Sequence, residues 1–310
     1  MEKALVLGAS GGMGYSLVKE LSSRGIKVVA FARTKSRLER LFAHDYNVEI
    51  VTGNLFQKSE LARAAKGVDM IFHSANIPYR EWDEKLLTLI ANIVEVAKEQ
   101  SIKLAVVDNI YAYGRSDGEL VTETKLKKPH TKKGKLRLQA EETIKQSGVP
   151  YVIAHFPDFY GPNAESAILQ YTLNTVVKDK KSGFVGNKGI AREFIFTPDG
   201  AKALVELALT DEAYGENWNI PGYGVITGEE IELILRKITG YQKKISTVTK
   251  GMIQFLGIFN KDMREVVEMF YLNEQPVVLT GEKYEKRIGP VPRTSYDAGL
   301  KQTIEFMKAK

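Results

Sequence analysis

The stretch Gly8-Ala9-Ser10-Gly11-Gly12-Met13-Gly14 decides how the rest of the chain is interpreted. The apolar run Ala4–Leu7 precedes it and predicts a buried strand, and the apolar spacing of Tyr15–Leu21 predicts a helix after it. Glycines allow a tight turn from strand to helix and let backbone N–H groups approach a pyrophosphate, to which the helix N-terminus adds partial positive charge. The order of strand, glycine-rich turn and helix therefore predicts a dinucleotide-binding unit.

The second predicted strand, Val28–Ala32, ends at Arg33. This end lies about twenty residues beyond the glycines, where a residue of a dinucleotide fold contacts the adenosine ribose. An acidic residue there would bind a free 2′-hydroxyl, whereas Arg33 can pair with a 2′-phosphate, and Lys35 and Arg37 follow closely. We therefore expect NADP as the cofactor, with NAD as second choice. The alternative is that Arg33 only ends an exposed strand.

The glycine spacing G-x-x-G-x-x-G at Gly8, Gly11 and Gly14 resembles the short-chain dehydrogenase/reductase superfamily. The length and the C-terminal half resemble its extended, NAD-dependent epimerase/dehydratase-like branch. Strands and helices alternate five times before residue 108, which itself predicts an α/β fold with a doubly wound parallel sheet. We expect a Rossmann domain over residues 1–162, completed by about 190–222, and a smaller substrate-binding part formed by about 163–189 and 223–310.

Composition and charge restrict the partners. The 310 residues carry 44 basic and 38 acidic side chains, a net charge of +6, with part of the excess between Lys125 and Arg137. This suits an anionic cofactor or substrate, but no aromatic-interleaved basic stripe accompanies it, so we expect no nucleic-acid partner. The chain has no cysteine, and its four histidines lack ligand spacing, so we expect no metal.

The first predicted strand begins close to Met1, and no apolar run reaches membrane-spanning length. We therefore expect a cytoplasmic protein with no signal peptide and no membrane partner. It would act on an unknown small molecule, as a monomer or a homodimer.

The resemblance implies cofactor contacts where the predicted strands end. Asn54 stands where the family has an Asp that contacts the adenine amino group, and Leu55 stands at the hydrophobic position that follows. The side-chain oxygen of Asn54 can accept that bond, and a simple turn is the equal alternative. His73 begins a segment that resembles the one beside the ribose and phosphates, and we expect it to be a packed core histidine. The expected cofactor-binding residues are Gly8, Ser10, Gly11, Gly12, Met13, Gly14, Arg33, Asn54, Leu55, Ser74, Ala75, Asn76, Asn109, Arg137, Phe156, Pro157 and Phe159.

The catalytic region departs from the family. Asn109 stands where a serine or threonine polarises the substrate oxygen, and Lys133 and Arg137 stand where the family has Tyr-x-x-x-Lys, on the predicted helix 131–146. An amide can still donate to a carbonyl, and a neighbouring guanidinium would lower the pKa of Lys133 and suit it to acid–base chemistry. The alternative is that this basic helix face meets solvent. Tyr111 and Tyr113 are the tyrosines near enough to substitute as the proton donor, and at most one of them would face the cleft.

Beyond this region the pattern supports the same branch. The stretch Phe156-Pro157-Asp158-Phe159-Tyr160-Gly161-Pro162 resembles the loop under the nicotinamide, with His155 in place of the family's arginine. On the predicted helix 131–146, Glu141 matches the glutamate that follows the family's Tyr-x-x-x-Lys. Thr197 and Thr227 are expected helix N-caps. The apolar cluster of Met252, Phe255, Leu256, Ile258 and Phe259 predicts helix packing, with a pocket wall or a dimer contact as the alternative.

Two functions of different class follow. One is an NADP-binding oxidoreductase-like protein of the extended short-chain type whose Ser-Tyr-Lys site is degenerate at Asn109, Lys133 and Arg137. The other is a non-catalytic NAD(P)-binding sensor. The absent Tyr-x-x-x-Lys favours the sensor, and the Phe-Tyr-Gly-Pro loop with a second part favours the enzyme.

Overall fold

The computed structural model describes residues 1–309 of the chain. Its strands are β1 (Lys3–Leu7), β2 (Lys27–Ala32), β3 (Val48–Thr52), β4 (Met70–His73), β5 (Lys103–Asn109), β6 (Tyr151–Phe156), β7 (Asp158–Tyr160), β8 (Ser182–Val185), β9 (Arg192–Phe196), β10 (Glu216–Asn219), β11 (Val225–Ile226) and β12 (Ile245–Val248).

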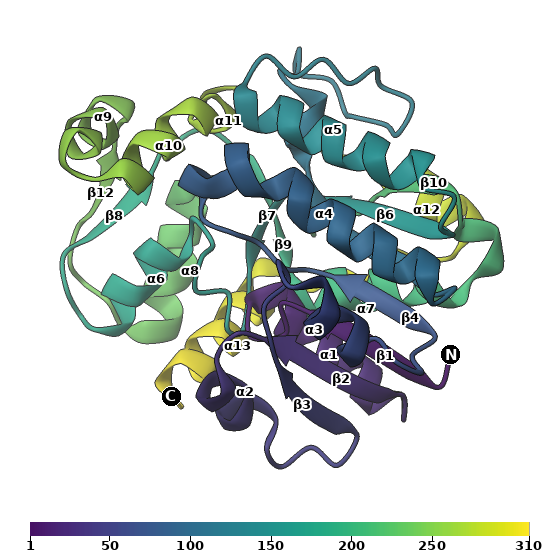
Figure 1. Cartoon of the computed structure of the whole chain (residues 1–310). Coiled ribbons are helices and arrows are strands. Elements are labelled where there is room, and N and C mark those ends of the chain that lie inside the picture. Colours follow the sequence, from purple (N-terminus) through teal and green to yellow (C-terminus); the bar gives the residue numbers. More distant parts are fainter. Residues whose placement is uncertain (310) are drawn as a thin grey trace.

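The α-helices surround these strands (Figure 1). They are α1 (Gly12–Ser23), α2 (Lys35–Phe42), α3 (Lys58–Ala64), α4 (Trp82–Glu99), α5 (Lys132–Gln146), α6 (Gln170–Val177), α7 (Thr197–Leu209), α8 (Gly228–Thr239), α9 (Lys250–Phe259), α10 (Lys261–Met269), α11 (Tyr271–Glu274), α12 (Glu282–Arg287) and α13 (Tyr296–Lys308). Short 3₁₀ helices are η1 (Tyr79–Glu81), η2 (Ile110–Tyr113) and η3 (Asp211–Ala213).

The central sheet confirms the predicted doubly wound fold. Its seven strands run in the order β10-β6-β5-β4-β1-β2-β3, and each neighbouring pair is parallel. The chain builds outward from β1 through β2 and β3, and then returns to the other side of β1 with β4. The strand order reverses at this point, so the carboxyl ends of β1 and β4 border the crevice in which such sheets bind ligands.

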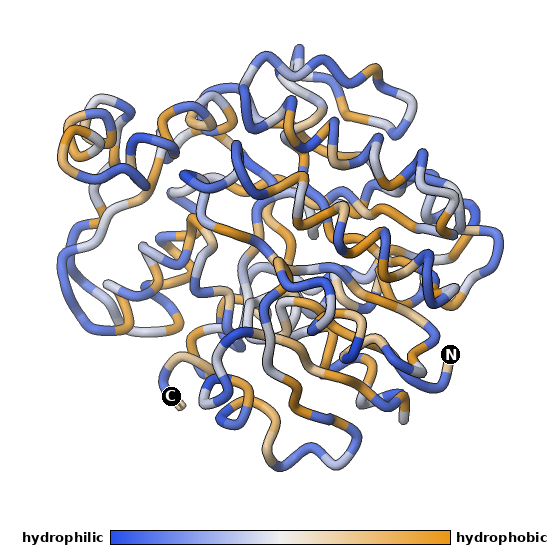
Figure 2. The backbone as a smooth tube through the Cα atoms, viewed as in Figure 1, coloured by the Kyte–Doolittle hydropathy of each residue, from blue (hydrophilic) through white to orange (hydrophobic). Residues whose placement is uncertain are grey.

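Alternate residues of the strands supply two separate cores. Ala4 and Val6 of β1 face the layer that contains α1 and α7, while Leu5 and Leu7 face the layer that contains α3, α4 and α5. Both faces of the sheet are therefore covered, which explains why its strands read as continuous apolar runs rather than as an alternation. The orange strands between blue outer helix faces show this pattern in Figure 2.

One helix start differs from its sequence-based position. Thr197 is the first residue of α7 rather than its N-cap, because the extended Phe196 occupies the cap position. By contrast, Thr227 caps α8 as expected, and it forms a reciprocal capping box with Glu230.

The C-terminal half adds two small sheets, β11-β9-β7 and β12-β8, to the central sheet. An apolar cluster that includes Phe194, Ile226 and Leu235 joins β9, β11 and α8. Helices α9 and α10 pack on each other as a hairpin, which projects from the upper left of the molecule in Figure 1. Within residues 1–309, no helix is both long enough and apolar enough to span a bilayer.

Candidate dinucleotide and substrate site

The glycine-rich turn joins β1 to α1 through a tight approach of two backbone segments. Gly8 has a φ of +81°, and a Cβ atom at Gly14 would lie 2.1 Å from the carbonyl oxygen of Gly8. Only glycine at position 14 lets the helix start so close to the strand end. The predicted turn is therefore built as the sequence indicates.

The N-terminus of α1 lacks a protein cap. Gly11 occupies the N-cap position without a side-chain hydrogen bond, and the first turn holds no acidic residue. The N–H groups of the first helical turn need an acceptor, and an anion is the natural one at this end of the helix dipole. The exposed Gly11 leaves this end of the helix open to solvent. These features fit the pyrophosphate of a dinucleotide.

The Phe-Tyr-Gly-Pro segment lies against the same turn. The side chain of Asn163 donates a hydrogen bond to the carbonyl of Ser10 at 3.0 Å, and a Cβ atom at Gly12 would lie 2.7 Å from the Cα of Ala164. Phe156 is fully buried, and its ring lies 5.7 Å from that of Phe159. The segment expected beside the cofactor thus borders the glycine-rich turn.

The end of β2 presents one arginine without an ion pair. Lys35 pairs with Glu39 at 3.4 Å, and Arg37 pairs with Glu165 at 2.6 Å. Arg33 is exposed, and in residues 1–309 it has no ion-pair partner. Of the three cations expected near the adenosine ribose, Arg33 is the one whose charge is available to a phosphate.

The ends of β3 and β4 shape the neighbouring wall of the crevice. The side-chain oxygen of Asn54 accepts a hydrogen bond from the N–H of Phe56 at 3.1 Å, which is the turn interpretation of this residue. The hydroxyl of Ser74 donates a hydrogen bond to the carbonyl of Leu7 at 2.8 Å. Ala75 lies so close to Gly8 that a Cβ atom added at Gly8 would be 2.6 Å from the Cα of Ala75. The small residues expected after β4 therefore permit this close packing.

His73 is a packed core histidine, as the sequence indicates. Its ring is buried, and burial lowers the pKa of the imidazole to about 3, with the positive charge of Arg137 adding to the effect. A neutral, buried ring of this kind belongs to the wall of the site rather than to its chemistry.

The end of β5 places Asn109 and two tyrosines in different surroundings. The side-chain oxygen of Asn109 accepts from the N–H of Tyr111 at 3.0 Å, while its amide nitrogen has no partner among the described residues. Tyr113 points away from this end, is buried, and donates to Asn219 at 2.7 Å. We expected at most one of the two tyrosines to face the cleft. Because Tyr113 is buried and bonded to Asn219, Tyr111 is the better candidate.

Tyr111 forms a hydroxyl pair with a residue that the sequence analysis missed. Its hydroxyl lies 2.5 Å from that of Tyr79 in η1. Burial raises the pKa of Tyr111 well above 10, with the neighbouring Tyr79 as a further cause. Tyr79 follows Pro78 at the start of η1 and belongs to no sequence motif, so only the folded chain brings the two hydroxyls together.

Lys133 is neither a depressed lysine nor a solvent-facing one, so both sequence-based interpretations of its surroundings are wrong. Its ammonium is buried, 2.5 Å from a carboxylate oxygen of Glu265 and 2.8 Å from one of Glu268, both on α10. Burial alone would lower the pKa of Lys133, but the hydrogen bonds to these two carboxylates outweigh burial and raise it. The expected repulsion from Arg137 therefore does not lower the pKa of Lys133, because Glu265 and Glu268 of α10 supply the counterions of its ammonium.

Arg137 also lies inside the protein rather than in solvent. Its guanidinium is 3.5 Å from Asp108 and lies over the ring of Trp82, 4.5 Å from the centroid. Its buried Nε has no hydrogen-bond partner among residues 1–309. A buried donor without an acceptor is costly, so this atom is a candidate contact for a polar ligand group.

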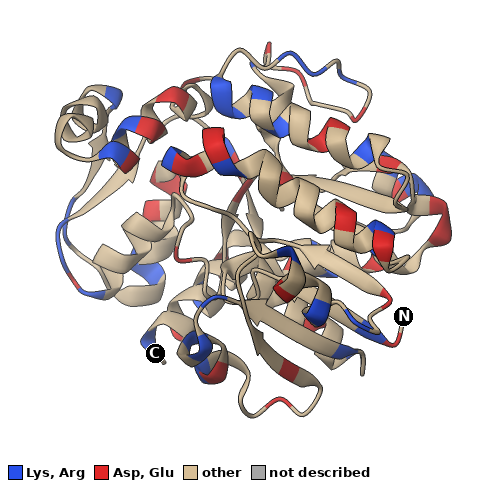
Figure 3. Cartoon of the chain, in the orientation of Figure 1, with Lys and Arg blue, Asp and Glu red and all other residues tan. Residues whose placement is uncertain are grey.

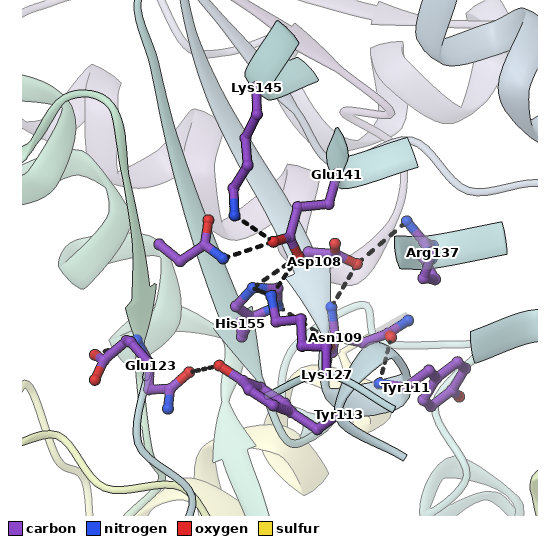
Figure 4. A network of polar contacts seen from close by, with 12 residues as sticks. Asp108, Asn109, Tyr111, Tyr113, Glu123, Lys127, Arg137, Glu141, Lys145 and His155 are labelled. Carbon is purple, nitrogen blue, oxygen red and sulfur yellow. Dashed lines mark hydrogen bonds and ion pairs between the residues drawn. The ribbon is translucent and has the colours of Figure 1, made fainter. Parts of the chain in front are cut away.

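A buried polar network lies behind the end of β5 (Figure 4). Glu141 of α5 contacts Lys127 and accepts from Lys145 at 2.6 Å, and Nε2 of His155 lies 2.8 Å from Lys127. Burial alone would raise the pKa of Glu141, but contacts with His155 and Lys127 hold it far below its ordinary value. With histidine in place of the family's arginine at position 155, the cation beside Glu141 comes from Lys127.

The same network gathers three groups of the kind that ligate metals, which histidine spacing did not indicate. Ligand atoms of Asp108, Glu141 and His155 lie within 4.8 Å of one another. The ammonium of Lys127 already contacts both Glu141 and His155, and a guanidinium faces Asp108. Because cations of the protein neutralise these carboxylates, the charge balance does not require a metal.

Comparisons with known proteins agree with this geometry. The sequence pattern of the NAD(P)H-binding family matches residues 8–191. The chain is 25% identical over 263 residues to an uncharacterized UDP-glucose epimerase of Bacillus subtilis, covering 77% of this chain and 82% of that protein. It is 21% identical over 267 residues to a photosystem II assembly factor of Synechocystis, covering 84% of this chain and 74% of the relative.

Among solved structures, the dTDP-glucose 4,6-dehydratase of Bacillus anthracis in complex with NAD superposes with a TM-score of 0.82 at 19% identity. The alignment covers 100% of this chain and 97% of the dehydratase. At this identity the likeness shows the fold, and the fold is that of the NAD-dependent epimerase/dehydratase branch of short-chain dehydrogenases/reductases. The family match extends over more than half of the chain and begins at the glycine-rich turn. The chain therefore belongs to the NAD(P)H-binding family.

Proposed function

We propose that this protein is an NADP-dependent oxidoreductase acting on a small carbonyl or hydroxyl compound, with a proton-transfer site that lacks the usual tyrosine and lysine. The observation that carries the proposal is the uncapped N-terminus of α1, which follows β1, together with Arg33 at the end of the neighbouring β2, which has no ion pair among the described residues. A 2′-phosphate would give Arg33 a charge-assisted hydrogen bond, which is among the stronger kinds. The dehydratase with the same fold was solved with NAD, which supports a dinucleotide in this crevice.

The protein's own groups would hold the substrate oxygen in the proposed site. NADP(H) would supply or accept the hydride. The amide nitrogen of Asn109 would donate to the substrate oxygen, and the Tyr111 hydroxyl would hold the proton nearest to it. The pKa of Tyr111 is raised well above 10, so this phenol is a poor acid at neutral pH and we expect slow turnover.

The proposed substrate-binding part consists of residues 163–189 and 223–310, set against a nucleotide-binding part of residues 1–162 and 190–222. Two ion pairs join these parts. Glu265 of α10 reaches Lys133, and Arg80 of η1 pairs with Asp262 at 2.7 Å. The C-terminal hairpin thus lies next to the positions expected to contact substrate.

The second candidate function is a non-catalytic NADP-binding sensor. One observation favours it: two carboxylates neutralise Lys133, at the position where the resembled family has its catalytic tyrosine. A relative named as a photosystem II assembly factor also supports a function other than metabolic turnover. In a sensor, cofactor occupancy would alter the contacts of the protein with a partner rather than drive a reaction.

A turnover screen separates the two functions. NADPH oxidation would be followed with a panel of aldehydes, ketones and nucleotide sugars, and products would be identified by mass spectrometry. An oxidoreductase gives a product whose formation shifts from NADPH toward NADH in Arg33→Asp, which excludes a contaminating enzyme. Tight NADPH binding without turnover on any compound would favour the sensor. Absence of both binding and turnover would contradict both functions.

A further inference from the structure

Helix α9 exposes a large apolar face. Its inner side consists of Ile253 and Gly257, and a Cβ atom at Gly257 would lie 3.0 Å from the Cα of Arg264, so α10 packs directly against it. This contact fixes the rotation of the helix and leaves five apolar side chains between 49 and 79% exposed. These residues, which we name the α9 face, are Met252, Phe255, Leu256, Ile258 and Phe259.

The exposure corrects the sequence-based expectation that this cluster packs inside the protein. Five large apolar side chains gathered on one short helix differ from the single exposed apolar residues that any protein surface carries. Figure 2 shows the α9 coil largely orange at the outer edge of the molecule. Such a face marks contact with another protein or with a lipid surface.

The charged side chains around the α9 face that form no ion pair among residues 1–309 are all basic. Lys250, Lys261 and Arg264 are exposed and have no ion pair with any other residue of 1–309, and α9 itself contains no acidic residue. The acidic side chains of α10 are directed elsewhere: Asp262 pairs with Arg80, and Glu265 and Glu268 pair with Lys133. In Figure 3 the α9 ribbon is tan apart from its basic start, and the α10 ribbon carries both blue and red segments.

We propose that the α9 face binds the surface of an anionic lipid bilayer. An amphipathic helix with bulky apolar residues on one side and basic residues around it lies in the interfacial plane, where the apolar side chains enter the acyl boundary. Each basic residue near an anionic surface adds attraction, which salt screens. Lys250 and Lys261 stand at the two ends of the apolar face, so both can meet lipid phosphates while Phe255 and Phe259 insert.

A second copy of this chain fits the α9 face less well. A twofold interface brings the same surface of each copy together. Two antiparallel α9 helices would place Lys250 of one copy near Lys261 of the other, with no acidic side chain on α9 to neutralise them. The expectation of no membrane partner rested on the absence of a spanning run, and binding at the surface of a bilayer needs no such run.

Vesicle flotation with the full-length protein tests the proposal. Large unilamellar vesicles would contain either equal parts of dioleoylphosphatidylglycerol and dioleoylphosphatidylcholine or the latter alone. We expect flotation with the anionic vesicles, at least tenfold less with the neutral ones, and a decrease as salt rises. The double variant Phe255→Ser/Phe259→Ser should lose binding at least tenfold, and Lys250→Gln/Lys261→Gln should lose several-fold.

Matched controls separate this surface from general effects. Leu233→Ser removes an equally exposed apolar residue from α8, and Lys66→Gln removes an exposed lysine that has no ion pair among residues 1–309. Both should float like the wild type, and circular dichroism should show all variants folded. Two results would overturn the proposal: wild-type protein that does not float with anionic vesicles, or an equilibrium dimer in sedimentation that only Phe255→Ser/Phe259→Ser dissociates.

Discussion

Glu265 of α10 accepts a hydrogen bond from the ammonium of Lys133 at 2.5 Å, which ties the C-terminal hairpin to the first turn of α5. Lys133 stands where the resembled family has its tyrosine. In this protein the side chain at that position binds a carboxylate of its own chain. The contact gives the lysine a structural role.

Lys133→Met should lower the free energy of unfolding by about 1–3 kcal/mol at neutral pH, since a buried hydrogen-bonded charge is lost. The pKa of Lys133 is raised above its ordinary 10.5 in the folded protein. The stabilisation is therefore fully present below about pH 10.5 and is lost as pH rises through the folded pKa. Urea unfolding at neutral pH and at pH about 11 measures the difference. Lys135→Met, an exposed change on the same helix, is the control, and equal stability of Lys133→Met and wild type at neutral pH would refute the role.

Lys127→Met should destabilise the fold by about 3 kcal/mol or more, because it removes the nearest cation from the buried carboxylate of Glu141. The pKa of Glu141 is depressed in the folded protein, so its contribution is present above about pH 4.5 and is lost as pH falls toward the folded pKa. The variant should lose less stability than wild type over that acid range. Denaturant titrations at several pH values test this, with the exposed Lys128→Met as control. Parallel pH profiles for wild type and Lys127→Met would contradict it.

Gly14→Ala should damage both the fold and the cofactor site. The added methyl group would meet the Gly8 carbonyl at 2.1 Å, so the turn must move, at a cost of about 1–3 kcal/mol. Thermal unfolding and NADPH affinity should both decrease. Gly189→Ala, where a Cβ atom meets nothing closer than 3.5 Å, should change neither. Unaltered NADPH affinity in a folded Gly14→Ala variant would place the cofactor elsewhere.

Tyr113→Phe should mainly lower the stability of the fold, whereas Tyr111→Phe should mainly lower the rate of any NADPH-dependent reaction. Tyr113→Phe leaves the buried acceptor of Asn219 without its hydrogen bond, so we expect a stability loss of about 1–3 kcal/mol and little change in any NADPH-dependent rate. Tyr111→Phe should reduce the rate less than a hundredfold, because its raised pKa makes it a weak acid. Unfolding curves and initial rates for both variants, beside Lys133→Ala, provide the check. A larger loss in Tyr111→Phe would show that a tyrosine mechanism operates here.

The sequence predicted those parts of the protein whose patterns are local. The glycines of the first turn, the apolar runs of the parallel strands and the N-cap at Thr227 each follow from a few adjacent residues, and the structure contains them. The resemblance correctly indicated an NAD(P)-binding family with the fold of epimerases and dehydratases, because it rests on the same local motifs.

The remaining features depend on contacts between distant segments. No spacing rule connects Lys133 with Glu265 and Glu268, which lie 132 and 135 residues away, so the sequence suggested a lowered pKa where the pKa is raised. The exposure of Phe255 and Phe259 could not be predicted from the sequence either, because apolar periodicity predicts a helix face but does not show what covers that face.

Calorimetric titration of the wild-type protein with NADPH and with NADH tests the central claim most directly. Arg33 should give NADPH at least a tenfold higher affinity, and Arg33→Asp should reverse the preference. Arg40→Asp makes the same charge change farther along α2, where Arg40 is also exposed, and should leave the preference as in wild type. Equal wild-type affinity for NADPH and NADH, or no binding of either, would contradict the account.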